Sequence, residues 1–182
     1  MALKSTVFKA DLGVADMDRG YYGDHSLTLA RHPSETDERL MVRLLAFALN
    51  AQEYLEFGRG ISTDDEADLW RRDLTGAIEQ WIDVGLPDER DIRKASNRAN
   101  EVVLYTYGGR AAEIWWEQNQ NKLARLTNLT VVNLAAAETQ ALATLAERTM
   151  RLQVTVQDGH LYVAGEGEPV EVTPVFWKRA EG

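Results

Sequence analysis

The most restrictive feature of the sequence is an unbroken run of strand-forming residues from Val102 to Tyr107, within EVVLYTYG. All six residues are β-branched, aromatic or aliphatic. A short run of this kind without polar alternation predicts a buried strand. A buried strand needs neighbours that cover it, so the segments that precede it decide which fold it belongs to.

Those segments, residues 34–108, predict the order helix, three strands, helix, strand. The clearest helix begins near Ser34, the expected N-cap, where Glu35, Asp37 and Glu38 favour the positive end of the helix dipole. Apolar residues recur at helical spacing through RLMVRLLAFALNA. Strands are expected in YLEFGRGIS and AIEQWIDVG, with a strand between them that DDEADLWRRD leads into, and a surface helix is expected in DERDIRKASNRA.

Further strands are expected near both ends of the chain. Residues 5–13 and 25–31 alternate in polarity around a turn rich in Asp and Gly. The tail after residue 150 alternates too, and Asp158-Gly159 is a strong hairpin signal. Between these regions, RAAEIWWEQNQNKLARL predicts a helix, TNLTVVNL a strand and AAAETQALATLAERT a last helix. The terminal strands are expected to form a separate β-layer.

The chain length of 182 residues favours one domain. No internal repeat or flexible linker divides it. We therefore expect a single domain over 1–182, with a core at 34–134 and an accessory β-layer from 1–31 and 150–177.

Composition removes several classes of site. The chain has no cysteine and only three histidines, at positions 25, 32 and 160, so thiolate sites are excluded and no zinc ligand cluster is evident. Any metal would be a hard cation held by carboxylates. The net charge of -9 disfavours non-specific attraction to nucleic-acid phosphates.

No run approaches the ~18 apolar residues that a membrane-spanning helix needs. The N-terminal MALKSTVFKADLGV alternates and lacks the features of a secretory signal. We expect a cytoplasmic protein without a membrane partner. A monomer is expected, with the alternative that the strand RLQVTVQ forms an assembly interface.

Several segments resemble the YaeQ family of bacterial proteins: MALKSTVFKA, SLTLARHPSETDERLMVRLLAF, STDDEADLW, WIDVGLPDERDIRKA, YTYGGRAAEIWWEQNQ and ERTMRLQVTVQDG. The resemblance spans nearly the whole chain. It implies a variant of the restriction-endonuclease-like, PD-(D/E)XK architecture, and the element order deduced above is the order of that core. The expected fold class is thus α/β (α+β): a mixed sheet flanked by helices, with an additional antiparallel β-layer. The family has no settled biochemical function.

The resemblance also implies where a metal site would lie. Nucleases of this architecture hold Mg²⁺ or Mn²⁺ with acids from the first helix and from two neighbouring strands. The candidate metal ligands are Glu38, Asp68, Glu79 and Asp83. Mg²⁺ takes few protein ligands at short range, so only acids that converge cooperate.

Spacing separates two of these acids. Glu79 and Asp83 share a strand face but lie about 13 Å apart, too far to bind one ion. If the second and third strands pair around Leu74 to Gly76, Asp68 lies near Trp81, although a one-residue slip reverses the faces. We expect Asp68 to act with Glu79 and keep Asp83 in reserve.

The usual catalytic lysine of such nucleases is missing. Two residues after Glu79 stands Trp81, and two residues after Asp83 stands Gly85. Lys94, on the following helix, is the candidate replacement. Arg71, Arg72 and Arg110 are weaker substitutes.

Each candidate also has a purely structural interpretation. Glu79 and Asp83 fit a solvated strand face with Arg71 or Arg72 as cross-strand partners, and Glu38 fits a first-turn helix acid. Lys94 fits a helix-surface ion pair. Two functions stay open: metal-dependent phosphodiester hydrolysis on nucleic acid, and a non-catalytic binding or regulatory module, with unknown protein partners, that keeps the nuclease-like fold.

Overall fold

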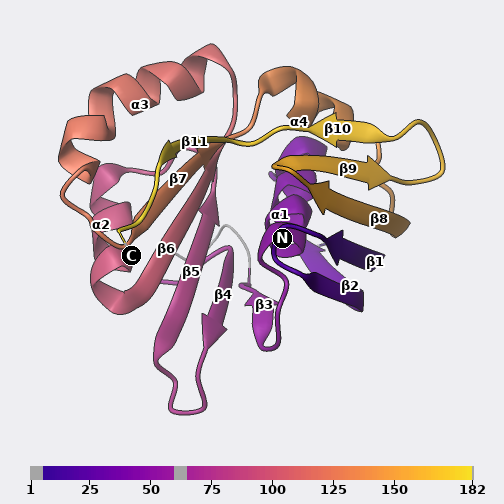
Figure 1. Cartoon of the computed structure of the whole chain (residues 1–182), viewed down its shortest axis with the longest axis horizontal. Coiled ribbons are helices and arrows are strands. Elements are labelled where there is room, and N and C mark those ends of the chain that lie inside the picture. Colours follow the sequence, from indigo (N-terminus) through magenta and orange to yellow (C-terminus); the bar gives the residue numbers. More distant parts are fainter. Residues whose placement is uncertain (1–5, 60–64, 182) are drawn as a thin grey trace.

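The computed structural model describes residues 6–59 and 65–181, which form two mixed β-sheets and four helices (Figure 1). The helices are α1 (Asp37–Asn50), α2 (Glu89–Arg98), α3 (Arg110–Leu123) and α4 (Ala136–Ala143). The strands are β1 (Thr6–Asp16), β2 (Tyr21–Arg31), β3 (Leu55–Phe57), β4 (Leu69–Arg72), β5 (Ile78–Val84), β6 (Ala99–Thr106), β7 (Leu129–Asn133), β8 (Thr149–Gln157), β9 (His160–Ala164), β10 (Val170–Val172) and β11 (Val175–Lys178). The predicted α/β (α+β) class is confirmed. The parts of two predicted strands at residues 5 and 60–62 lie outside the described residues.

The six-stranded sheet has the order β11-β7-β6-β5-β4-β3. The central strand β6 is parallel to both β5 and β7, and Val102 to Thr106 are all buried. The prediction of a buried strand here is confirmed, because α1 lies on one face of the sheet and α2 and α3 on the other (Figure 1). The order α1, β3, β4, β5, α2, β6 matches the predicted order.

The five-stranded sheet has the order β10-β9-β8-β1-β2, so strands from the two chain ends form the second layer as predicted. The expectation that this layer is entirely antiparallel is wrong for one pair: β1 and β8 run parallel, whereas the other pairs are antiparallel. The predicted hairpin is present, with Asp158 at φ 53° and Gly159 at φ 77° between β8 and β9. Strand β8, which contains RLQVTVQ, is paired on both edges. The last strand, β11, joins the six-stranded sheet instead.

Helix α1 lies between the two sheets (Figure 1). Nine consecutive residues from Leu40 to Ala48 are buried, as expected for a helix covered on all sides. The helix begins at Asp37, and its N-cap is Thr36, whose side chain accepts from the Arg39 amide at 3.1 Å. The prediction of Ser34 as the N-cap is therefore wrong: the Ser34 hydroxyl bonds to the imidazole of His32 instead.

A smaller apolar cluster covers the other face of the six-stranded sheet. Trp70 and Trp81 meet edge to face at 5.7 Å in this cluster, and Ile92 and Ala95 of α2 pack there as well. None of the helices within residues 6–59 and 65–181 combines the length and the apolar character that crossing a membrane requires.

Candidate functional site

Asp68 and Asp83 lie side by side where β4 begins and β5 ends. Leu69 pairs with Ile82 in the antiparallel register, so the next residues toward the ends of the two strands, Asp68 and Asp83, lie opposite each other. The Asp68 amide donates to Asp83 Oδ1 at 3.1 Å, and the Val84 amide donates to Asp68 Oδ2 at 2.9 Å. Each carboxylate therefore accepts a hydrogen bond from a backbone amide of the neighbouring strand, just beyond the last regular backbone pair of β4 and β5.

The other two carboxylate oxygens of the pair also accept hydrogen bonds. Trp81 Nε1 donates to Asp83 Oδ2 at 2.9 Å, and Arg39 Nη2 donates to Asp68 Oδ1 at 2.8 Å. All four oxygens are thus engaged by groups of the protein. Arg39 supplies the positive charge next to Asp68.

Arg39 belongs to a network of buried and half-buried charges centred on Glu35. The Glu35 side chain is 1% exposed and accepts from Arg39 at 2.6 Å and from Arg43 at 2.7 and 2.9 Å. In the order Arg43, Glu35, Arg39, Asp68 the charges alternate in sign, so each charged side chain has an oppositely charged neighbour. Burial of charged groups requires such pairing. The network fixes the start of α1 against β4.

Burial raises the pKa of Asp83 to about 7, and the negative charge of Asp68 adds to the shift. The hydrogen bond from Trp81 and the charge of Arg39 act in the opposite direction without cancelling it. Burial of Arg39 opposes its charge, but the carboxylates of Asp68 and Glu35 outweigh that effect and raise its pKa. Asp83 therefore titrates near neutral pH while Arg39 stays charged.

The predicted register of β4 and β5 is wrong by two residues. Asp68 was expected near Trp81, but Trp81 faces Trp70, and Asp68 faces Asp83. A bulge between Arg71 and Arg72, next to the turn between the strands, breaks the regular pairing that the prediction assumed. The reserve candidate Asp83 is thus the neighbour of Asp68.

The remaining predicted residues lie elsewhere. Glu79 forms an ion pair with Arg71 across the two strands, as the structural interpretation expected. Glu38 accepts a hydrogen bond from Thr139 of α4 at 2.8 Å. Lys94 is exposed on α2 and makes no ion pair among the described residues. The structure therefore brings together only Asp68 and Asp83 as a directly interacting pair.

At the carboxylate pair, Mg²⁺ would compete with hydrogen-bond donors of the protein. Each of the four oxygens accepts one hydrogen bond, and a guanidinium occupies the cationic position beside Asp68. Across residues 6–59 and 65–181, no group of three or more His, Cys, Asp or Glu side chains has the geometry to hold a metal ion. In this arrangement the pair is better suited to fix the sheet edge than to coordinate a cation.

Sequence reasoning missed Arg39, Arg43 and the central role of Glu35. One signal was available: Arg43 stands within the apolar run LMVRLLAF, at a position that helical spacing buries. A buried arginine needs a carboxylate partner, so the sequence favoured an acidic partner near this helix.

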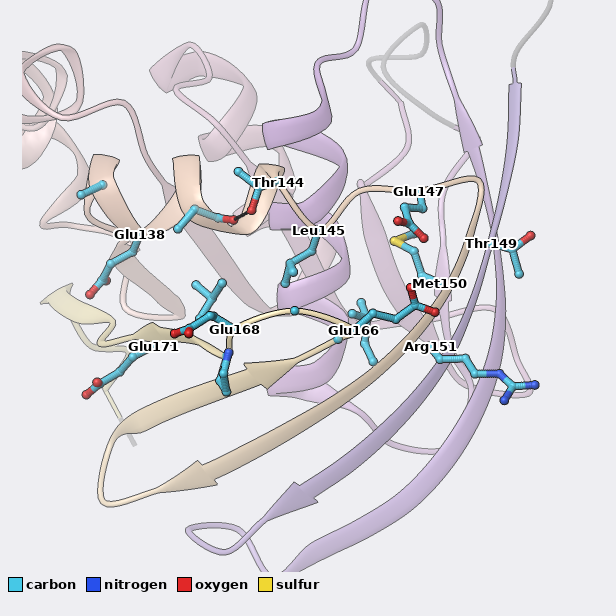
Figure 2. Close-up of a pocket in the computed structure, with 17 residues that line it drawn as sticks. Glu138, Thr144, Leu145, Glu147, Thr149, Met150, Arg151, Glu166, Glu168 and Glu171 are labelled. Carbon is cyan, nitrogen blue, oxygen red and sulfur yellow. Dashed lines mark hydrogen bonds between the residues drawn. The ribbon is translucent and has the colours of Figure 1, made fainter.

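A second feature is a groove of about 710 Å³ between α4 and the start of β8 on one side and the β9–β10 loop on the other (Figure 2). We call it the acidic groove. Leu145, Met150 and Leu152 line its apolar part, and Met150 and Leu152 also belong to the main core.

Five glutamates line the acidic groove, against a single cation, Arg151. Figure 2 shows glutamates distributed along its whole length, while the Arg151 side chain extends away from α4. The glutamates are Glu138, Glu147, Glu166, Glu168 and Glu171.

Comparison with known proteins gives consistent results over nearly the whole chain. The family model described as "YaeQ protein" matches residues 1–174. The chain is 49% identical over 179 residues to "Uncharacterized protein YaeQ" of Escherichia coli K12, covering 98% of this chain and 99% of that protein. The protein of the same description from Salmonella typhi is 47% identical with the same coverage.

Two crystal structures are similar throughout. The YaeQ protein from Xanthomonas axonopodis pv. citri has a TM-score of 0.93 at 54% identity, covering 98% of this chain and 99% of that one. The YaeQ protein from Pseudomonas syringae has a TM-score of 0.93 at 34% identity, covering 98% of both chains.

Proposed function

The chain belongs to the YaeQ family, and from the geometry of Asp68 and Asp83 we propose that it is a non-catalytic binding module built on a nuclease-like order of elements. One observation carries the proposal: every oxygen of the two carboxylates accepts a hydrogen bond from the protein. Acids engaged in this way stabilise the junction of α1, β4 and β5.

The missing lysine supports the same proposal. Gly85 stands two residues after Asp83, and the exposed Lys94 lies on α2. Among residues 6–59 and 65–181, no lysine forms a hydrogen bond or ion pair with either carboxylate.

The second candidate function is Mg²⁺- or Mn²⁺-dependent hydrolysis of phosphodiesters in nucleic acid. It is favoured by one observation, the pKa of Asp83 near 7, since a pair of carboxylates with a strongly shifted pKa is typical of functional sites. This function requires Arg39 to release Asp68, so that a carboxylate becomes available to a cation.

The two candidates are separated by activity and by metal binding. DNA and RNA panels are incubated with Mg²⁺ or Mn²⁺, using the wild type, Asp83→Asn and, as a control outside the pair, Glu79→Gln. Thermal unfolding is followed with and without Mn²⁺, because a ligand that binds only the folded state raises the midpoint.

The binding module predicts no turnover and no rise in midpoint with Mn²⁺. Turnover that is lost in Asp83→Asn and kept in Glu79→Gln, with both variants folded, would overturn the proposal and support the hydrolase. A midpoint that rises with Mn²⁺ in the wild type but not in Asp83→Asn would also count against it.

A further inference from the structure

We propose that the acidic groove docks a cationic protein segment, whose Lys or Arg side chains pair with the glutamates while its apolar side chains contact the exposed part of Leu145. This inference rests on the proposed binding function and names the chemistry of the partner. Three properties of the groove carry it: its shape, its apolar part and its uncompensated charge.

The shape is that of a binding site. The volume of about 710 Å³ lies within the range of roughly 300–1,000 Å³ typical of ligand pockets. The backbone of Gly165 packs closely on the floor of the groove, since a Cβ atom there would lie 3.3 Å from Leu152 Cδ2 and 3.6 Å from Leu145 Cδ2.

The apolar part is supported from below by the core. Met150 is 3% exposed and Leu152 is 7% exposed, and both pack in the main apolar cluster. Leu145 packs against that cluster from the groove side. Of the three, only Leu145 is half-buried, so it is the side chain whose apolar surface a partner removes from water, with a gain in free energy.

The charge of the groove is uncompensated. Glu147, Glu166 and Glu168 are exposed and make no ion pair or side-chain hydrogen bond among the described residues. The other two glutamates have partners: Glu138 accepts from the Thr173 amide at 3.1 Å, and Glu171 lies 3.8 Å from His160. Like charges gathered on one concave surface repel each other, so a cationic partner is favoured and an anionic one is rejected.

The combination of acidic and apolar surface favours a protein segment over nucleic acid or a metal ion. Nucleic acid is repelled by the glutamates and by the chain's net charge of -9. A metal ion gains nothing from the apolar surface. A segment that carries both cationic and apolar side chains uses both parts of the groove.

The test measures binding of a short fluorescein-labelled peptide of lysine and leucine by fluorescence anisotropy. Glu166→Lys/Glu168→Lys reverses two exposed groove charges. Glu53→Lys/Glu117→Lys changes the net charge equally at exposed positions outside the groove. We expect the groove variant to bind about tenfold more weakly or worse, since two attractive exposed pairs become repulsive, and the control variant to bind like the wild type.

Three comparison ligands test the two halves of the proposal. A peptide with glutamate in place of each lysine is expected not to bind, one with serine in place of each leucine is expected to bind more weakly, and spermine is expected to compete poorly. Circular dichroism melting confirms that both variants fold.

Absence of saturable binding of the lysine–leucine peptide would overturn the inference. Equal weakening in the groove and control variants would overturn it as well, because binding would follow net charge alone. Full binding of the serine peptide, or competition by spermine as strong as by the peptide, would replace the docked segment with a simple polyamine site. These results are independent of the Asp83-dependent turnover that would overturn the non-catalytic proposal.

Discussion

The side chains of Asp68 and Asp83 link β4 to β5: each accepts a hydrogen bond from a backbone amide of the opposite strand, at 2.9 and 3.1 Å. The same two carboxyl groups interact electrostatically, and the pKa of Asp83 is raised to about 7 by burial and by the charge of Asp68. Because of this raised pKa, the free energy of unfolding depends on pH through Asp83.

Asp83→Asn is expected to remove that dependence. An unfolded aspartate has a pKa near 3.9, so between about pH 4 and pH 7 the unfolded chain has released a proton that folded Asp83 keeps. The wild type therefore loses stability as pH rises through this window, with a limiting slope of about 1.4 kcal/mol per pH unit. Urea unfolding of both proteins from pH 4 to 8 measures the difference, which should grow up to pH 7 and then level off. Parallel pH profiles would contradict the assignment.

Glu35→Gln is expected to destabilise the fold by about 3 kcal/mol or more, because it leaves Arg39 and Arg43 without their shared buried carboxylate. The matched control is Glu79→Gln, which breaks the partly exposed pair with Arg71 and should cost less than ~1 kcal/mol. Chemical denaturation gives both values. Equal losses would show that the buried network has no special role.

Thr36→Ala is expected to cost about 1 kcal/mol, because the side chain of Thr36 caps α1 through the Arg39 amide. Ser34→Ala removes only an exposed hydrogen bond to His32 and should change stability by less than ~0.5 kcal/mol. Comparison of the unfolding midpoints decides which residue is the N-cap. The opposite ranking would restore Ser34 to that position.

Gly159→Ala is expected to cost about 1–2 kcal/mol, because residue 159 has φ 77° in the turn of the β8–β9 hairpin. Gly167→Ala is the control, since a Cβ atom there meets nothing within 4 Å and its φ is not positive. That variant should be neutral within ~0.5 kcal/mol. Thermal unfolding compares the two, and a neutral Gly159→Ala would argue against a left-handed turn.

The order of elements was predictable because its signals are local. The run from Val102 to Tyr107 and the pair Asp158-Gly159 specify a buried strand and a hairpin through their own backbone and side-chain preferences. Apolar spacing likewise predicted α1, although its first residue was misplaced. Helix starts depend on one side-chain hydrogen bond, which neighbouring Ser and Thr residues compete to make.

The candidate site was predictable only in part, because it depends on contacts between distant residues. Asp68 was identified, but its neighbour depended on a bulge between Arg71 and Arg72 that no local pattern indicated. Arg39 and Asp68 are 29 positions apart, and their bond forms only once α1 and β4 are packed together. Long-range pairing of this kind follows from tertiary packing, which periodicity does not encode.

The parallel pairing of β1 with β8 has a consequence for biosynthesis. A ribosome releases β1 and β2 long before β8, so one edge of β1 stays unpaired until β8 emerges. Folding of this layer therefore depends on the synthesis of β8, and a nascent chain stalled before β8 leaves β1 without its second neighbour.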